Sequence, residues 1–153
     1  MKTPPRPQVR DAARVLLLDP DGQVLLILGG DPAAPEAGTW WITPGGGLEP
    51  GEDARAAAIR EVREETGHVL HDVVGPVLRR SSTFVFDGRL IEQRELYFTA
   101  RVPAFEPRRE GWTDLERRAL HGTAWWSAEQ LRSTAETVYP EGLADLVEQA
   151  VSL

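Results

Sequence analysis

Three glutamates, Glu61, Glu64 and Glu65, lie close together in the segment IREVREETG. Their i, i+3, i+4 spacing places them on one face of a helix, whereas Ile59 and Val62 fall on a side that can pack. Like charges at this spacing repel, and no lysine separates them, so a bound cation explains the cluster well. Hard divalent cations such as Mg²⁺ are typically held by one or two carboxylates together with substrate phosphates. The residues therefore predict a metal site for a phosphate-bearing substrate, with a solvated, charged helix face as the alternative.

A strand, a glycine-rich turn and a helix are expected to position these acids. The run TWWIT at residues 39–43 predicts a strand that Pro44 ends. The three glycines at 45–47 permit positive φ and a close approach of the backbone to a ligand, with a plain tight turn as the alternative. We expect the helix over residues 53–66, with acids at its start and Gly67 as its C-terminal stop.

The order of residues between Gly46 and Gly67 resembles the Nudix box, the signature of the Nudix hydrolase family. Five residues separate Gly46 from Glu52, and seven residues separate Glu52 from Arg60. The other positions that match the box are Glu61, Val62, Glu64, Glu65 and Gly67. One departure is His68, where the family prefers an apolar residue, and we expect His68 to begin a strand and to pack. The detailed resemblance covers this box, and the rest of the chain matches in general layout.

The resemblance implies an α/β fold, the Nudix-type α/β/α sandwich with a mixed β-sheet. It also implies a Mg²⁺- or Mn²⁺-dependent hydrolase that cleaves a pyrophosphate bond in a nucleoside diphosphate linked to another moiety. By position, the metal ligands would be Glu61, Glu64 and Glu65, with the Gly46 carbonyl as a further ligand. We interpret Glu52 and Arg60 as residues that orient these ligands, a support that such sites need.

The general base is open among several glutamates. Within the helix, Glu64 or Glu65 could combine this role with metal binding. Some family members instead use a glutamate from the loop before the last strand, and here Glu110 and Glu116 fit that description. We favour Glu116, which is nearer to the expected strand. A base must lie within hydrogen-bond reach of the attacking water.

Aromatic and basic residues are candidates for substrate binding. In a strand, Trp40 and Trp41 point to opposite faces, so one can pack while the other stacks on a base. Trp40 is our candidate for stacking, and burial of both tryptophans is the alternative. Guanidinium groups pair well with phosphate, which makes Arg79, Arg80 and Arg94 candidates, with surface salt bridges as the alternative.

The substrate is predicted less sharply than the reaction. Some Nudix subgroups that cleave ADP-ribose or dinucleoside polyphosphates carry a marker proline or tyrosine 15 to 18 residues after the box. Here residues 82–86 read STFVF and contain neither. We therefore favour a nucleoside triphosphate, including a modified one, over ADP-ribose, dinucleoside polyphosphates and nucleotide sugars. A non-catalytic nucleotide sensor is less favoured, because every catalytic position of the box is present.

Composition sets the outer limits. The 153 residues, 41% hydrophobic and 27% charged, predict one globular domain over residues 9–153 after a flexible, proline-rich segment 1–8. A net charge of -7 argues against binding to a nucleic acid duplex. The absence of cysteine excludes thiol nucleophiles, disulfides and cysteine-bound zinc. No run of 18 apolar residues predicts a membrane span. We expect a cytoplasmic monomer or homodimer that acts on a small nucleotide.

The remaining elements follow from apolar runs and turn residues. We expect a hairpin of residues 9–18 and 23–28 around a Pro-Asp-Gly turn, buried on both faces, and a loop over residues 29–38. Further strands are predicted at 69–80, 82–88, 90–102 and 116–127, with Asp87-Gly88 as a hairpin turn. Helices are predicted at 127–134 and 140–151, after an irregular loop at 103–115.

Overall fold

The structure is a computed structural model, and it describes residues 6–152. Most of the lead-in expected at residues 1–8 lies outside this range, and the first strand begins at Gln8. The elements are, in order, β1 (Gln8–Leu18), β2 (Val24–Gly30), a 3₁₀ helix η1 (Pro35–Ala37), β3 (Thr39–Ile42), β4 (Gly45–Gly47), α1 (Ala54–Thr66), β5 (Val74–Phe86), β6 (Arg89–Arg101), α2 (Asp114–Ala119), β7 (Leu120–Trp126), α3 (Ala128–Ser133) and α4 (Leu143–Val151).

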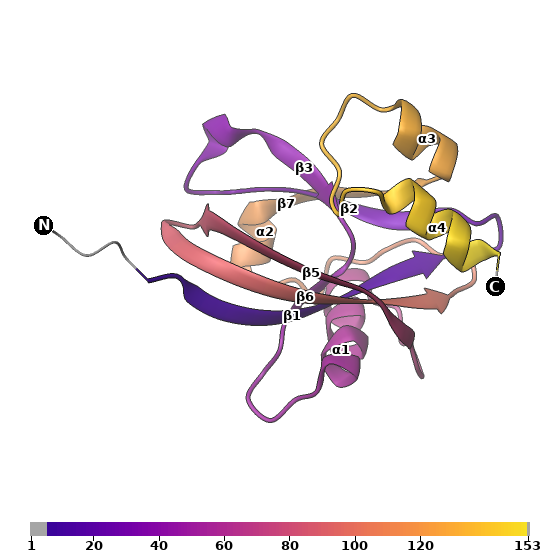
Figure 1. Cartoon of the computed structure of the whole chain (residues 1–153), viewed down its shortest axis with the longest axis horizontal. Coiled ribbons are helices and arrows are strands. Elements are labelled where there is room, and N and C mark those ends of the chain that lie inside the picture. Colours follow the sequence, from indigo (N-terminus) through magenta and orange to yellow (C-terminus); the bar gives the residue numbers. More distant parts are fainter. Residues whose placement is uncertain (1–5, 153) are drawn as a thin grey trace, which may run out of the picture.

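The strands form one mixed sheet, as expected. Its main order is β3-β2-β1-β6-β5, with β4 added to β1 and β7 added to β2. The pairing of β1 with β6 is parallel along the whole of β1, whereas the other pairings are antiparallel. Helix α1 covers one side of the β1-β6 region and α4 covers the other (Figure 1). The predicted α/β fold with helices on both faces is confirmed.

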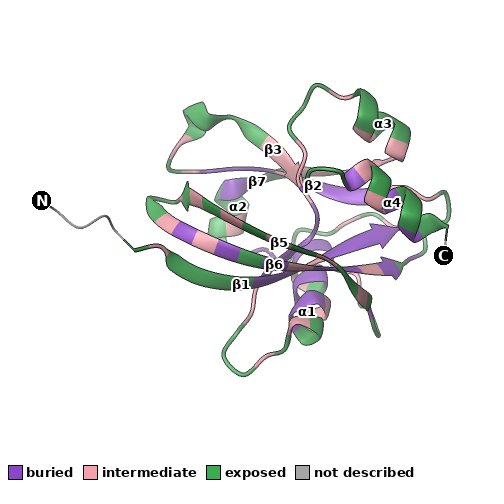
Figure 2. Ribbon diagram, in the orientation of Figure 1, coloured by how far each residue is buried: buried purple, intermediate pink, exposed green. Residues whose placement is uncertain are grey.

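The C-terminal end of β1 is buried on both faces, which explains the apolar run VLLL at residues 15–18. On one face, Val15 belongs to the same buried cluster as Val62 of α1. On the other face, Leu16 belongs to a cluster with Val147 of α4. Residues 15–18 of β1 are accordingly buried, whereas the N-terminal end of the strand is exposed (Figure 2).

The hairpin expected between β1 and β2 forms only at its turn. The two strands pair at Leu18 and Val24, and the Asp19 side chain accepts hydrogen bonds from the amides of Asp21 and Gln23. Beyond the turn the strands diverge, because β1 pairs with β6 and β4 while β2 pairs with β3 and β7. The sheet therefore divides into two halves at this point.

Two expectations about loops and strands were wrong. The glycines at 45–47 form a short strand antiparallel to β1 and not a turn. Their lack of side chains allows this, because a Cβ at Gly45 would overlap the Ala13 carbonyl. The region after α1 contains one long strand, β5, where two were predicted, and residues 69–73 lie before it. The predicted turn at Asp87 and Gly88 is confirmed, with positive φ at both residues.

The strand predicted over residues 116–127 was wrong in its first part. Helix α2 occupies Asp114–Ala119, and β7 begins at Leu120. A capping box starts the helix, because Thr113 and Glu116 each accept a hydrogen bond from the other's backbone amide. His68 also does not begin a strand, but it does pack, with its ring stacked 4.6 Å from the ring of Phe105.

No helix within residues 6–152 combines the length and the apolar character needed to span a membrane. The longest, α1, has 13 residues and presents charged side chains along part of its surface.

A buried ion pair lies on the α4 side of the sheet. Glu95 of β6 is only 3% exposed and accepts hydrogen bonds from Nε of Arg14 and, at 2.9 Å, from Nη1 of Arg80. Burial alone would raise the pKa of Glu95, but the two guanidinium groups outweigh it and hold this pKa below its usual value. The ionised form of Glu95 is therefore the one that the fold stabilises.

This arrangement predicts an acid-dependent loss of stability. Because the pKa of Glu95 is lower in the folded chain, its contribution is complete above the unfolded pKa and is lost as pH falls through the folded pKa. At pH 7, Glu95→Gln should lower the free energy of unfolding by about 3 kcal/mol, since it leaves two arginines without a carboxylate. Urea unfolding from pH 7 to pH 3 should show the difference from wild type shrinking below about pH 4.5. A difference that is constant over this range would contradict the assignment.

Candidate active site

Helix α1 carries two of the acids into the interior. It begins after Asp53, whose carboxylate accepts a hydrogen bond from the Ala56 amide at 2.7 Å, and ends at Gly67 in the left-handed conformation. Glu61 is 9% exposed and Glu65 is 3% exposed. These two carboxylates therefore do not form a solvated, charged face, which was the alternative for this segment.

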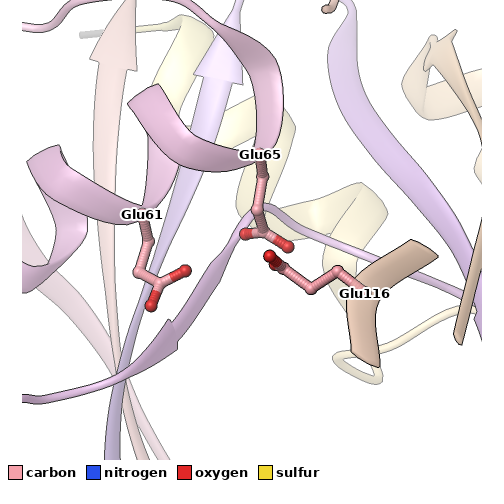
Figure 3. A group of neighbouring side chains, drawn as sticks. All are labelled: Glu61, Glu65 and Glu116. Atoms are coloured by element: carbon pink, nitrogen blue, oxygen red, sulfur yellow. The ribbon is translucent and has the colours of Figure 1, made fainter. Parts of the chain in front are cut away.

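Glu116 of α2 completes a group of three carboxylates. One oxygen each from Glu61, Glu65 and Glu116 can be chosen so that all lie within 4.8 Å of one another. Figure 3 shows Glu116 reaching from α2 toward the carboxylate of Glu65, with Glu61 one turn away on α1. The indole Nε1 of Trp112 donates a hydrogen bond to the Glu65 carbonyl at 2.7 Å, which ties the segment before α2 to α1.

The glycine strand β4 lies directly against these acids. The Gly45 amide donates a hydrogen bond of 2.6 Å to Oε1 of Glu65. A Cβ on Gly46 would stand 2.6 Å from Cδ of Glu61, so only glycine leaves this carboxylate in place. The backbone at Gly46 thus approaches the carboxylates closely. The role of the Gly46 carbonyl as a metal ligand stays a prediction.

Arg60 braces the outer side of the site. Its Nε and Nη2 each donate to Glu52 at 2.8 Å, and its Nη1 donates to Glu61 at 2.9 Å and to Glu64 at 3.2 Å. Its Nη2 also donates to the Gly47 carbonyl at 2.9 Å. Hydrogen bonds from Arg60 lower the pKa of Glu52 to about 2. Arg60 thus contacts two of the candidate ligands together with Glu52, and the role of Glu52 and Arg60 in orienting these ligands stays a prediction.

Glu64 differs from the other two acids of the helix. Its side chain is 37% exposed and it pairs with Arg60, outside the close group formed by Glu61, Glu65 and Glu116. The sequence predicted a convergence of Glu61, Glu64 and Glu65, and the described structure instead places Glu116 with Glu61 and Glu65. The metal-binding role of Glu64 stays a prediction.

The electrostatics of the group suit a divalent cation. Burial raises the pKa of Glu61, and burial together with the charges of Glu61 and Glu116 raises the pKa of Glu65 well above its usual value. Carboxylates held this close favour either protonation or a bound cation. Oxygen donors are the ligands that Mg²⁺ and Mn²⁺ prefer. The donor set therefore fits the metal that the resemblance implies, with Glu61 and Glu65 as residues that would hold it and the Glu116 carboxylate beside them.

The two tryptophans of β3 separate as predicted. Trp41 packs edge-to-face against Trp126, with ring centroids 5.2 Å apart. Trp40 points to the other face, the one on which Ile42 packs with Trp112 next to α2. Trp40 is thus on the side of the sheet that carries the three carboxylates, and its contact with a base stays a prediction.

The predicted phosphate-binding arginines lie in different environments. Arg79 and Arg94 are exposed, and Nε of Arg94 lies 3.9 Å from a Glu92 oxygen. Arg80 points to the α4 side, where it pairs with Glu95. Phosphate contacts of Arg79 and Arg94 stay predictions. Glu110, the second candidate for the base, is exposed and does not belong to the carboxylate group.

Two residues that hold segments of the site in place were not identified from the sequence. Trp112 holds the segment before α2 onto α1, and Arg14 donates a hydrogen bond to the Thr43 carbonyl at 3.0 Å. Arg14 had a signal, since it is a charge within the apolar run AARVLLL. A charge inside an otherwise buried strand needs a partner, and Glu95 is the acid that the fold supplies.

Replacing Arg60 by alanine is expected to weaken Mn²⁺ binding by about 10- to 100-fold, the usual range for groups that orient metal ligands. The reason is that Arg60 holds both Glu61 and Glu64. Isothermal titration with MnCl₂ would measure the change. Arg55→Ala is the matched control, because Arg55 is also on α1 but bonds to Asp72 and to backbone carbonyls beyond the site. Equal losses in both variants would contradict the role of Arg60.

Comparison with known proteins agrees with this architecture. A family model described as the NUDIX domain matches residues 8–147. The uncharacterized Nudix hydrolase YvcI of Bacillus subtilis is 39% identical over 84 residues, which cover 54% of this chain and 48% of that protein. The RNA pyrophosphohydrolase of Sphingopyxis alaskensis is 42% identical over 72 residues, 47% of this chain and 42% of that protein. The chain thus spans about half the length, or less, of these curated relatives.

A solved structure shows the same fold over nearly the whole chain. The MutT NUDIX hydrolase from Burkholderia pseudomallei superposes with a TM-score of 0.64 at 24% identity, covering 93% of this chain and 98% of that one. The family match extends well beyond the box on α1 and includes the strands on both sides of it. The chain belongs to the Nudix hydrolase family.

Proposed function

We propose that the chain is a metal-dependent pyrophosphohydrolase that cleaves a phosphoric anhydride bond in a nucleoside diphosphate linked to another group. The observation that carries this proposal is the group of three carboxylates formed by the buried Glu61 and Glu65 and the partly exposed Glu116, set against the glycine strand β4. When bound, Mg²⁺ or Mn²⁺ would neutralise the diphosphate and lower the pKa of a coordinated water. The remaining groups that we assign to the reaction are side chains and backbone atoms of this chain.

The residues divide into three roles. Glu61 and Glu65 hold the cation, with Glu64 and the Gly46 carbonyl as further candidate ligands. Glu52 and Arg60 orient these ligands. Glu116 is the base that we favour, because α2 brings its carboxylate beside Glu65, where a water that attacks phosphorus would lose its proton. Glu64 and Glu65 are the alternative bases.

We propose a nucleoside triphosphate, including a modified one, as the first substrate to test. Trp40 would stack on the base, and Arg79 and Arg94 would contact phosphate. The relative from Sphingopyxis alaskensis is named for pyrophosphohydrolysis of RNA, so RNA with a 5′-triphosphate belongs among the substrates compared. ADP-ribose, dinucleoside polyphosphates and nucleotide sugars are the other classes.

Separation of the products formed from this panel by anion-exchange chromatography, with Mg²⁺ and with Mn²⁺, tests the proposal. A triphosphate yields phosphate or pyrophosphate, whereas ADP-ribose, dinucleoside polyphosphates and nucleotide sugars each yield two organic phosphates. We expect metal-dependent turnover that EDTA abolishes, with the highest kcat/KM for one of the nucleoside triphosphates. Turnover of ADP-ribose alone would keep the reaction and overturn the substrate class. The absence of turnover with every substrate, together with tight nucleotide binding, would instead support the non-catalytic sensor.

A further inference from the structure

The segment of residues 43–46 connects the buried ion pair on one side of the sheet to the carboxylates on the other. On the β1 side, Nη1 of Arg14 donates to the Thr43 carbonyl at 3.0 Å, and the Val15 amide donates to the Pro44 carbonyl at 2.9 Å. On the α1 side, the Gly45 amide donates to Glu65 at 2.6 Å. The segment is thus fixed by β1 and itself fixes Glu65.

The Arg14 side chain, which bonds to the Thr43 carbonyl, is itself held by an ion pair. Its side chain is 13% exposed, and its Nε donates to Glu95, which also accepts from Arg80. Gly45 lies directly on Arg14, since a Cβ at Gly45 would stand 2.7 Å from Cα and Cγ of Arg14. A shift of the Arg14 side chain would therefore displace the peptide that carries the Gly45 amide.

The two arginines on Glu95 provide an internal comparison. A role in stability alone would need only the ion pair, and both arginines form it. Arg14 additionally bonds to Thr43, whereas the guanidinium of Arg80 lies over the ring of Tyr139, 5.1 Å from its centroid. Of these two arginines, Arg14 is the one with a hydrogen bond to the segment that holds Glu65.

We propose that Arg14, held in place by Glu95, is a positioning residue for Glu65. By holding the Thr43 carbonyl, Arg14 fixes the peptide unit before Pro44, and together with the hydrogen bond from the Val15 amide to the Pro44 carbonyl this sets the direction of the Gly45 N–H. The Gly45 N–H binds one oxygen of Glu65 and so orients the carboxylate. This inference rests on the proposed function in one respect, the assignment of Glu65 as a residue that holds the metal.

A comparison of Arg14→Met with Arg80→Met tests the proposal. Both variants lose one partner of Glu95, so both should unfold at a lower temperature than wild type. Mn²⁺ titrations followed by electron paramagnetic resonance, without nucleotide, should show about 10- to 100-fold weaker binding for Arg14→Met. Arg80→Met should bind Mn²⁺ within about twofold of wild type. With substrate, Arg14→Met should lower kcat more than it changes KM.

Equal Mn²⁺ affinities in the two variants would overturn the proposal and leave Arg14 a stability role alone. Arg14→Lys replaces Arg14→Met if the latter does not fold, because one ammonium cannot reproduce the guanidinium fork that spans Glu95 and Thr43.

Hydrogen exchange of the Gly45 amide gives a readout independent of metal and substrate. Exchange should accelerate in the Arg14 variant and not in Arg80→Met, and unchanged exchange in both would also overturn the proposal. If the wild-type chain binds Mn²⁺ but hydrolyses no substrate, the proposed function is contradicted, whereas the comparison of Arg14→Met with Arg80→Met still tests the role of Arg14.

Discussion

A Glu65→Gln chain is expected to fold as wild type does and to turn over its substrate more slowly by about two to four orders of magnitude. The amide oxygen of glutamine can still accept the Gly45 hydrogen bond, but the negative charge that would hold the cation is gone. Because burial and two neighbouring carboxylates disfavour an ionised Glu65, the neutral side chain should leave the melting temperature equal or higher. Steady-state kinetics, Mn²⁺ titration and thermal unfolding would together check these three effects.

The variant Glu116→Gln tests whether Glu116 acts as the general base or as a metal ligand. If Glu116 takes the proton from water, kcat should fall by about two to four orders of magnitude while Mn²⁺ affinity is kept. If it holds the metal, affinity and kcat should fall together. Glu110→Gln is the control, since Glu110 is exposed and outside the carboxylate group, and its kcat should stay within about twofold of wild type. Full activity in both Glu65→Gln and Glu116→Gln would show that the site is elsewhere.

Gly46→Ala is also expected to weaken the site. The added methyl group would meet Glu61, with 2.6 Å to Cδ and 2.7 Å and 2.8 Å to the two oxygens. The Glu61 carboxylate must then move away from Glu65, so Mn²⁺ affinity and kcat should each fall by at least about tenfold. The backbone at Gly46 does not have the positive φ that makes alanine unfavourable, so the chain should still fold.

Gly47→Ala is the matched control one residue later. There the methyl group would meet the guanidinium of Arg10, 2.7 Å from its Nε, and this flexible and exposed side chain can move aside. Metal titrations on both variants would compare them directly. Similar losses for Gly46→Ala and Gly47→Ala would indicate a general disturbance of β4 and would contradict a specific effect on Glu61.

The features that the sequence predicted well are local ones. Helix α1 and the common face of Glu61 and Glu65 follow from helical periodicity, from Asp53 at the start and from Gly67 at the end, whereas the burial of these two acids was not predicted. The contact of Arg60 with Glu64 follows from their i, i+4 spacing along the same helix. These relations span few residues, and a periodic helix fixes them without knowledge of the rest of the fold.

The features that were missed depend on distant segments. Glu116 was a candidate, but its contact with Glu65 was not predicted. The loop before α2 is attached to α1 by Trp112 and by the Arg108 amide, and no pattern in the sequence shows these contacts. The capping box of α2 was present as Thr113 and Glu116, but the apolar residues after it suggested a strand. Arg14 and Glu95 approach through the parallel register of β1 and β6, which a single sequence does not reveal.

The origin of the third carboxylate affects how the family can diversify. Two acids of the group come from the box on α1, whereas Glu116 comes from a six-residue helix outside it, at the end of a connection that begins after β6. Connections of this kind tolerate insertions and deletions more readily than the elements that they join. A change of length between residues 102 and 113 is therefore expected to shift Glu116 relative to Glu65 while leaving the box intact. Classifying such chains as active or inactive requires the position of this second element as well as the signature.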